Sequence, residues 1–421
     1  MANNRIFYAC QAVALRPMGA DSAQSNFKIA HGVQSVGITT NFNLEQAFEL
    51  GQIQIYENIE GLPDVECTLE KVLDGYPLLY HLASQEAESA GLVGRSKPRT
   101  DVALAIYSDG QDSVNDAQAE PATTVFMSGM YMNSVSYTVP VDGNATESVT
   151  LVGNHKEWIK FGAGDIAKKS INRASNTGPA GFGTYGTAPK AGSSDYPMAY
   201  EGGSGGVQRR ENVMLAYSIL PFSLFGNLHG SITAGTEQTI SNTGNAWDST
   251  NKVPTLHLQN FSVSTDFGRE DIMELGRKAP YHRAPNFPIE VTTELESMAV
   301  SGDFVGAYEF GDPDLFNTNA SGDSTSEEYI LITLKGGIVF DMGASNRLSS
   351  VSYGGGDAAG GNATISYSYT NFNELTVMHS GDPANRWPGA GAYHGGTMNY
   401  SEDQSGILLA DALSIDEDLG S

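Results

Sequence analysis

Two pairs of glutamates are the strongest candidates for chemistry in this chain: Glu66 with Glu70, and Glu290 with Glu294. A spacing of four residues puts both carboxylates of a pair on one face of an extended strand. Paired carboxylates serve glycoside hydrolases as acid and as base or nucleophile. Both pairs, however, lie on segments that we predict to be open strand faces, one pair in each half of the chain. A repeated row of acids is better explained as a property of a surface than as two active sites.

The other candidates for chemistry are isolated in the sequence. His379 and His394 lie near Asp382 but match no zinc spacing, and the GDPD run at residues 311–314 is typical of a turn. The chain has no GxxxxGK[ST], HExxH or CxxC motif, and GGGDAAGG at residues 354–361 lacks the strand–GxGxxG–helix order of a dinucleotide site. We therefore predict that the protein is not an enzyme and has no metal site and no cofactor.

Composition narrows the class of protein further. The formal net charge of the 421 residues is −26, whereas a surface that grips nucleic acid needs clustered Lys and Arg. Cys10 and Cys67 are too few for a disulfide framework, and we predict that Cys67 is a buried, reduced thiol. No segment resembles a signal peptide or contains 18 consecutive apolar residues, so we expect a soluble protein made in the cytosol.

A stretch at residues 33–72 occurs twice. It contains VQSVGITTNF, a polar segment and VECTLEKV, and about 225 residues later come LQNFSVSTDF, another polar segment and IEVTTELE. At one constant offset Glu45, Leu50, Gly51 and Tyr56 match Glu270, Leu275, Gly276 and Tyr281, and after a slip of one residue Val65-Glu66 match Ile289-Glu290. This repeat predicts an internal duplication of one domain.

Each copy contains two segments in which apolar and polar residues alternate, which is typical of strands with one buried and one exposed face. The exposed rows carry small polar and acidic residues and no Lys or Arg. Each copy is therefore predicted to be a long β-hairpin with a polar, acidic outer face. The predicted buried rows are Val36, Ile38, Thr40 and Phe42; Val65, Cys67 and Leu69; Phe261, Val263, Thr265 and Phe267; and Ile289, Val291, Thr293 and Leu295.

Around the hairpins the sequence predicts strands at residues 5–15, 101–107 and 329–334, and a short helix within 75–91. The SVSY and GNAT runs, which also occur twice, predict a further pair of strands in each copy. Residues 206–226 are predicted to close the first domain with a strand. The resulting fold class is all-β, with two tandem sandwich-like or barrel-like domains. Their limits are 1–226, with a Gly-rich insertion at about 163–206, and 227–400, followed by an acidic tail at 401–421.

The polar segments inside the two hairpins, 43–64 and 268–288, differ in charge. Both are predicted to be loops, and ordinary solvated loops would account for the difference. Alternatively, the acidic loop of one domain meets the basic loop of a neighbour and sets the register of assembly. In that case the subunit interface contains Glu45, Glu49, Glu57 and Glu60 of the first loop and Arg269, Arg277, Lys278 and Arg283 of the second.

The order of these motifs resembles bacteriophage tail tube (major tail) proteins, here in a double-domain form. The residues that carry the resemblance are NF-x2-EQ-x3-LGQ and its twin DF-x2-ED-x3-LGR, the run GGVQRREN, and the stretch VFDMGASNRLSSVSYGGGDAAGGNATISYSYTNF. The resemblance covers both hairpins and most of the second half of the chain.

The resemblance implies a structural virion protein, located in the phage tail and made in the host cytoplasm. It implies that subunits form a ring with themselves, a homotrimer with pseudo-sixfold symmetry or a hexamer, and that rings stack into a tube with other tail proteins. DNA would pass through the lumen without specific binding. The expected lumen residues are those of the exposed rows: Ser35, Thr39, Asn41, Glu66, Thr68, Glu70, Asn260, Ser262, Ser264, Asp266, Glu290, Thr292 and Glu294.

A different class of protein stays open as an alternative. An all-β virion protein that binds carbohydrate or a receptor would use aromatic side chains as a platform. Trp387, Tyr393 and Tyr400 are the candidates for such a platform. They occur in only one half of the chain, in a Gly-rich segment.

Overall fold

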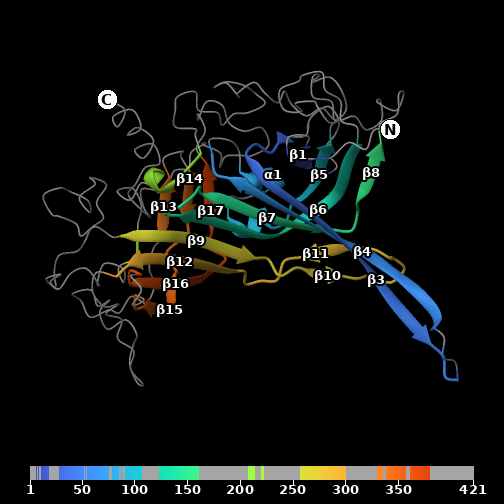
Figure 1. Ribbon diagram of the computed structural model, residues 1–421. Helices are drawn as coiled ribbons and strands as arrows, with labels where there is room; N and C mark the ends of the chain where they lie inside the picture. The colour runs from blue at the N-terminus through green and yellow to red at the C-terminus, as the bar shows by residue number, and fades with distance from the viewer. Residues whose placement is uncertain are drawn as a thin grey trace, which may run out of the picture.

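In the computed structural model the residues that the structure describes fold almost entirely into antiparallel β-structure, with two short α-helices among them (Figure 1). The all-β class predicted from the sequence is confirmed. The structure describes residues 11–18, 28–51, 55–74, 78–84, 91–106, 123–160, 207–213, 220–221, 257–299, 330–334, 338–356 and 361–379, and the single residues Ile6, Tyr8, Ile53 and Ala87.

The strands of the first part of the chain are β1 (Gln11–Pro17), β2 (Lys28–Ile29), β3 (Val33–Phe48), β4 (Ile55–Val72), β5 (Arg99–Ile106), β6 (Thr123–Pro140), β7 (Thr146–Gly153) and β8 (Glu157–Lys160). Two helices, α1 (Leu79–Ala83) and α2 (Leu92–Arg95), lie between β4 and β5, and a 3₁₀ helix, η2, covers Arg210–Asn212. The second part contains β9 (Leu258–Asp266), β10 (Glu270–Ile272), β11 (His282–Ala284), β12 (Glu290–Met298), β13 (Leu331–Leu334), β14 (Ile338–Asp341), β15 (Arg347–Gly354), β16 (Thr364–Phe372) and β17 (Thr376–His379).

Eight of these strands form a continuous antiparallel sheet in the order β3-β4-β7-β6-β9-β12-β16-β15. Four strands come from each part of the chain. The two groups meet where β6 pairs with β9, from Ser134 opposite Asp266 to Pro140 opposite Asn260. Within the described residues β3 pairs only with β4, and β15 only with β16, so these strands are the two ends of the eight-stranded sheet.

The two groups of four strands have the same internal order, β3-β4-β7-β6 in the first and β9-β12-β16-β15 in the second. Each group also contains a register shift at the same place beside the SVSY run. It lies between Met132 and Ser134 in β6 and between Leu348 and Ser350 in β15. Two copies of one domain would produce this match, although the duplication itself stays a prediction.

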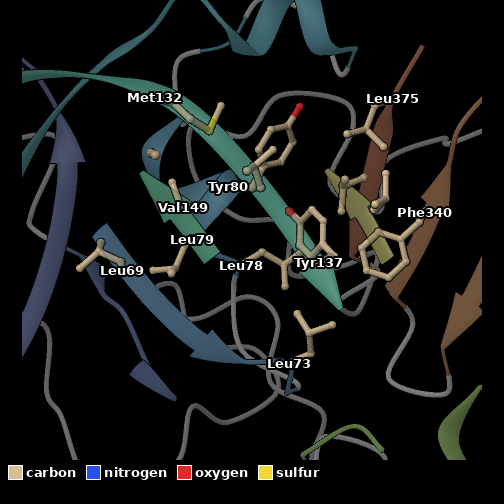
Figure 2. Close-up of a cluster of buried hydrophobic side chains, with 14 of the residues drawn as sticks. Leu69, Leu73, Leu78, Leu79, Tyr80, Met132, Tyr137, Val149, Phe340 and Leu375 are labelled. Carbon is tan, nitrogen blue, oxygen red and sulfur yellow. The ribbon is translucent and has the colours of Figure 1, made fainter. Parts of the chain in front are cut away.

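Further strands cover the buried face of this sheet. The first half of β6 pairs with β5 and β8, and β5 continues through β1 to β2. A separate sheet, β13-β14-β17, lies over the second part. The ring centroid of Phe340 in this sheet lies 4.7 Å from that of Tyr137 and 5.7 Å from that of Phe261. Figure 2 shows Phe340 beside Tyr137. Each fully buried side chain of this size contributes about 1.5–3 kcal/mol. The core therefore stabilises the pairing of β6 with β9, which is the internal joint between the two groups of strands.

The predicted loop at residues 43–64 is wrong. Strand β3 continues to Phe48 and β4 begins at Ile55, with backbone pairing from Leu44 opposite Glu60 to Ala47 opposite Glu57. Cross-strand backbone bonds sustain this hairpin despite its polar, Glu-rich sequence, and Figure 1 shows it extending away from the body of the molecule. The corresponding segment 268–288 contains only the short pair β10 and β11.

Other expected elements have mixed outcomes. The strands predicted at 101–107 and 329–334 are confirmed as β5 and β13, and the strand predicted at 5–15 is β1, shifted toward the C-terminus. The helix predicted within 75–91 is α1. Where a strand was predicted at 206–226, the described residues form η2 and isolated bridges, such as Val213 to Leu334. The insertion at 163–206, the 226/227 boundary and the 401–421 tail lie outside the described residues, so the domain limits stay predictions.

The sheet corrects the alignment of the two return strands. Thr39 lies opposite Glu66, and Ser264 lies opposite Thr292. Thr39 corresponds to Ser264 in the repeat, so their cross-strand partners correspond as well: Glu66 matches Thr292 and not Glu290. The alignment of the return strands thus changes by two residues, which leaves every side chain on its predicted face. In the corrected alignment Val65, Leu69 and Glu70 match Val291, Leu295 and Glu296.

Candidate functional site: the polar face of the sheet

One face of the eight-stranded sheet is covered with small polar and acidic side chains. Residues directly opposite each other in an antiparallel pair point to the same face, and the registers link Thr39 to Glu66, Ser136 to Ser264 and Ser264 to Thr292. The structure therefore brings together on this face every residue that the sequence assigned to the lumen: Ser35, Thr39, Asn41, Glu66, Thr68, Glu70, Asn260, Ser262, Ser264, Asp266, Glu290, Thr292 and Glu294.

The sequence analysis did not assign the remaining strands of the sheet to this face. Strands β6, β7, β15 and β16 add a second set of small hydroxyl side chains, and β12 adds Glu296. The alternation of polar and apolar residues could have assigned these strands to the face, because the SVSY runs show it as clearly as the hairpin strands do. The added residues are Ser134, Ser136, Thr138, Ser148, Thr150, Ser350, Ser352, Ser366, Ser368 and Thr370.

The charge of this face is strongly negative. Its carboxylates are Asp64, Glu66, Glu70, Asp266, Glu290, Glu294 and Glu296. On the paired segments of the eight strands its single base is Arg347, opposite Thr370. A surface with this charge repels phosphates and other polyanions.

The geometry does not suit glycoside hydrolysis. Along one strand, carboxylates four residues apart are separated by about 13 Å. Glycosidase pairs lie roughly 5–9.5 Å apart across the substrate. The pairs Glu66/Glu70 and Glu290/Glu294 therefore form part of a charged surface rather than a catalytic pair.

The opposite face of the sheet is the buried one. Cys67, in the middle of β4, is a free and buried thiol as predicted, and burial raises its pKa to about 12, with a smaller contribution from the charge of Glu66. Thr265 and Thr293 also point into this face and are buried. The hydroxyl of Thr265 donates to the backbone carbonyl of Glu290 at 2.8 Å, which satisfies one of these polar groups.

A buried carboxylate links the sheet to helix α1. Glu147 of β7 accepts hydrogen bonds from the backbone N–H groups of Leu79 (2.7 Å) and Tyr80 (2.9 Å) and from the hydroxyl of Tyr137 (3.0 Å). Burial raises the pKa of Glu147, and these hydrogen bonds and Lys71 partly oppose the rise. Figure 2 shows Leu79, Tyr80 and Tyr137 in one cluster of buried side chains.

The inward row of β3 departs from prediction at its end. Phe42 is 66% exposed, whereas Phe267, its counterpart at the end of β9, is fully buried. The difference follows from position, because β9 lies against β6 and β3 has no neighbour beyond it in the described residues. Several other apolar side chains of the projecting hairpin are exposed, including Leu44, Phe48 and Leu50.

Two of the basic residues predicted at a subunit interface make contacts inside the chain. Arg269 donates to the carbonyls of Met132 (2.6 Å), Ser96 (2.6 Å) and Arg283 (3.0 Å). Burial lowers the pKa of Arg269 to about 10. Arg283 is buried and lies 3.0 Å from Asp64 and 2.9 Å from Asp271. The two hairpin segments thus meet within one subunit, at Asp64 and Arg283.

The remaining predicted interface residues are solvent-exposed. Arg277 pairs with Glu274 at 3.2 Å, and Lys278 lies beside it on the surface. The acidic residues of the first hairpin, Glu45, Glu49, Glu57 and Glu60, line its projecting half. Their role between subunits stays a prediction.

No helix in the described part of the chain is long and apolar enough to cross a membrane. Among the same residues, no group of three or more His, Cys, Asp or Glu side chains is arranged to hold a metal ion. His394 and Asp382, and the aromatic residues Trp387, Tyr393 and Tyr400, lie outside the described residues.

Neither a protein-family model nor a curated protein matches the sequence. Several solved structures are similar to parts of the chain. The tube-terminating cap of the anti-feeding prophage is 12% identical over 38% of this chain and 95% of its own, with a TM-score of 0.27. A chain of the anti-feeding prophage baseplate is 11% identical over 38% of this chain and 98% of its own, with a TM-score of 0.29.

A third similar structure is the sheath–tube complex of an extracellular contractile injection system, PVC, in its extended state. It is 12% identical over 38% of this chain and 95% of its own, with a TM-score of 0.26. These neighbours are components of tail-like injection particles. At these scores the likeness carries no argument about the function of this chain.

Proposed function

We propose that this protein is a structural subunit of a phage tail tube, which assembles into rings that stack around an acidic channel for DNA. The observation that supports this proposal most directly is the polar, acidic face that extends without interruption across eight strands from both parts of the chain. An antiparallel sheet with one buried face and one solvated face is suited to the wall of a water-filled channel.

The charge of the face agrees with passage of DNA rather than with binding of it. Duplex DNA carries about one negative charge per 1.7 Å of its axis. A basic wall would release counterions and hold the phosphates tightly. Seven carboxylates with small hydroxyl side chains between them instead repel the phosphates and leave a layer of water.

The two ends of the sheet support the proposed ring. Strands β3 and β15 end the eight-stranded sheet, and pairing of one subunit's first end with the next subunit's last end is a heterologous contact that closes a ring. Closure also removes edges that would otherwise invite uncontrolled association. Because each subunit supplies two similar four-stranded groups, a homotrimer has six of them and pseudo-sixfold symmetry.

In this proposal the protein belongs to the virion tail and is made in the host cytoplasm. Its partners are copies of itself and other tail proteins, and DNA crosses the lumen without specific contacts. Electron microscopy of the purified protein tests the proposal. Rings or tubes with a central hole are expected, and class averages give the number of subunits. Isolated monomers that bind glycans would contradict it and favour the receptor-binding alternative.

A further inference from the structure

We infer that a second copy of this chain binds edge to edge, with its β3 pairing with β15 in the register that joins β6 to β9 inside one copy. The inference rests on the proposed function and adds to it the partner strands, their alignment and the side chains that the contact buries.

The joint inside the chain is the template. Strand β6 ends the first group of four strands and β9 begins the second, just as β15 ends the second group and β3 begins the first. At the internal joint Ser134 lies opposite Asp266 and Ser136 opposite Ser264. The N–H of Phe267 donates to the carbonyl of Asn133 at 2.8 Å, which continues the pairing one residue beyond the strand.

The alignment transfers without a gap. The SVSY run and the register shift before it place Ser134 of β6 on Ser350 of β15, and the repeated hairpin strand places Asp266 on Asn41. Residues of the polar face then oppose one another, and so do residues of the buried face, so both faces continue across the contact. A slip of one residue would turn one strand over. The expected pairs are Ser350 with Asn41, Val351 with Thr40, Ser352 with Thr39, Tyr353 with Ile38 and Gly354 with Gly37.

Exposure of matching side chains points to the same contact. Phe267 and Tyr137, which end the inward rows at the internal joint, are fully buried. Phe42 and Tyr353 hold the same places at the two open ends of the sheet and are 66% and 54% exposed. The contact between copies brings the ends together and removes both rings from water.

One feature of the internal joint has no counterpart. Arg269 lies over the ring of Tyr131 at 4.9 Å, but the matching positions are Leu44 and Arg347. The contact between copies therefore depends on backbone pairing and on burial of Phe42 and Tyr353. It has no equivalent of the Arg269–Tyr131 cation–π contact.

Disulfide trapping tests the register. In the double variant Ser352→Cys with Thr39→Cys, the new thiols face each other in a non-hydrogen-bonded pair, where Cβ atoms lie about 4.5–5.5 Å apart. Inside one copy the two positions are separated by seven strand spacings, or about 33 Å, so a bond must join two copies. Mild oxidation should give a covalent ladder on a denaturing gel. The matched control is Ser352→Cys with Ser35→Cys, which moves one thiol about 13 Å along the same face.

Efficient cross-linking of the Thr39 pair and little of the Ser35 pair supports the register. Equal cross-linking of both pairs, or of neither, overturns it. The last band of the ladder also gives the number of copies in a ring. If microscopy shows tubes but the Thr39 pair does not cross-link, this inference fails while the proposed function stands. If the Thr39 pair cross-links but microscopy shows linear assemblies without a central hole, the edge contact is supported and the proposed tube is contradicted.

Substitution of Phe42 gives a second test. Phe42→Ser should leave the melting temperature of the dispersed subunit unchanged, because the ring is exposed there, and should weaken assembly by about tenfold or more. Trp158→Ser is the matched control, because Trp158 is 56% exposed on β8, outside the eight-stranded sheet. Unchanged assembly of the Phe42 variant would contradict burial at the contact.

Discussion

Glu147 is an ionisable group that the fold buries and satisfies with three hydrogen bonds. Replacement by Leu leaves the N–H groups of Leu79 and Tyr80 and the hydroxyl of Tyr137 without their acceptor. Each unsatisfied buried group costs about 1–3 kcal/mol, so we expect Glu147→Leu to lower the free energy of unfolding by about 3 kcal/mol or more. Urea titration of the dispersed subunit measures this change. A loss below about 1 kcal/mol would show that the network contributes little to stability.

The same carboxyl gives the fold a pH dependence. Its pKa in the folded state is raised above 4.5, so the folded state keeps the proton at pH values where the unfolded state has lost it. The free energy of unfolding therefore falls as the pH rises from the unfolded pKa to the folded pKa. Glu147→Gln is neutral throughout and lacks this fall. The difference in unfolding free energy between wild type and Glu147→Gln should decrease with rising pH, and a constant difference would contradict the raised pKa.

Arg269 connects elements that are distant in the sequence. Its guanidinium bonds to carbonyls at Met132 on β6, Ser96 after α2 and Arg283 on β11. Arg269→Ala should lower the free energy of unfolding by about 2–4 kcal/mol, because three part-buried acceptors lose their donor. Lysine cannot reproduce the planar fork, so Arg269→Lys should recover only part of the loss. Thermal unfolding of the wild type, Arg269→Lys and Arg269→Ala should rank their stabilities in that order. Full recovery by lysine would show that charge alone is needed.

The exposed bases of segment 268–288 test whether opposite charges guide assembly. Reversing Arg283 would break its pairs with Asp64 and Asp271 inside the chain, so it is unsuitable for this purpose. Arg277→Glu with Lys278→Glu reverses two exposed charges and breaks only the surface pair with Glu274, so the melting temperature should stay within a degree or two. We expect slower assembly at low salt and little difference at high salt, measured by light scattering. Assembly equal to wild type at low salt would argue that these are ordinary solvated loops.

The comparison of β3 with β9 shows what the sequence could and could not predict. Alternation over ten residues predicted both faces of both strands, because the period of two is a local property. It could not predict that Phe267 is buried and Phe42 exposed. That difference depends on β6 lying beside β9, whereas no described strand lies beside β3 on the side away from β4. Nor did it reveal the strand pairing of Leu44 with Glu60, because backbone hydrogen bonds form without an apolar pattern.

At the scale of the whole molecule, the sheet acts as a single charged surface. Its polar face combines residues from eight strands, and no one strand carries more than three of the seven carboxylates. Exchange of Glu66, Glu70, Glu290 and Glu294 for Lys reverses most of this charge. All four side chains are exposed, so the fold and the assembly of the tube should persist, as microscopy and thermal unfolding would check.

The consequence of this reversal should appear in the movement of DNA. A tube lined with lysines attracts the phosphates, and each contact adds to a salt-dependent affinity. Phage carrying the four lysines should eject DNA more slowly, with the defect relieved at high salt, as followed by dye binding to the released DNA. Exchange of the same four residues for Gln is the matched control, because it removes repulsion without adding attraction, and ejection should be intermediate. Wild-type ejection with intact lysine tubes would show that this face does not line the channel, whereas loss of the fold would show that the four glutamates are not on a solvated surface.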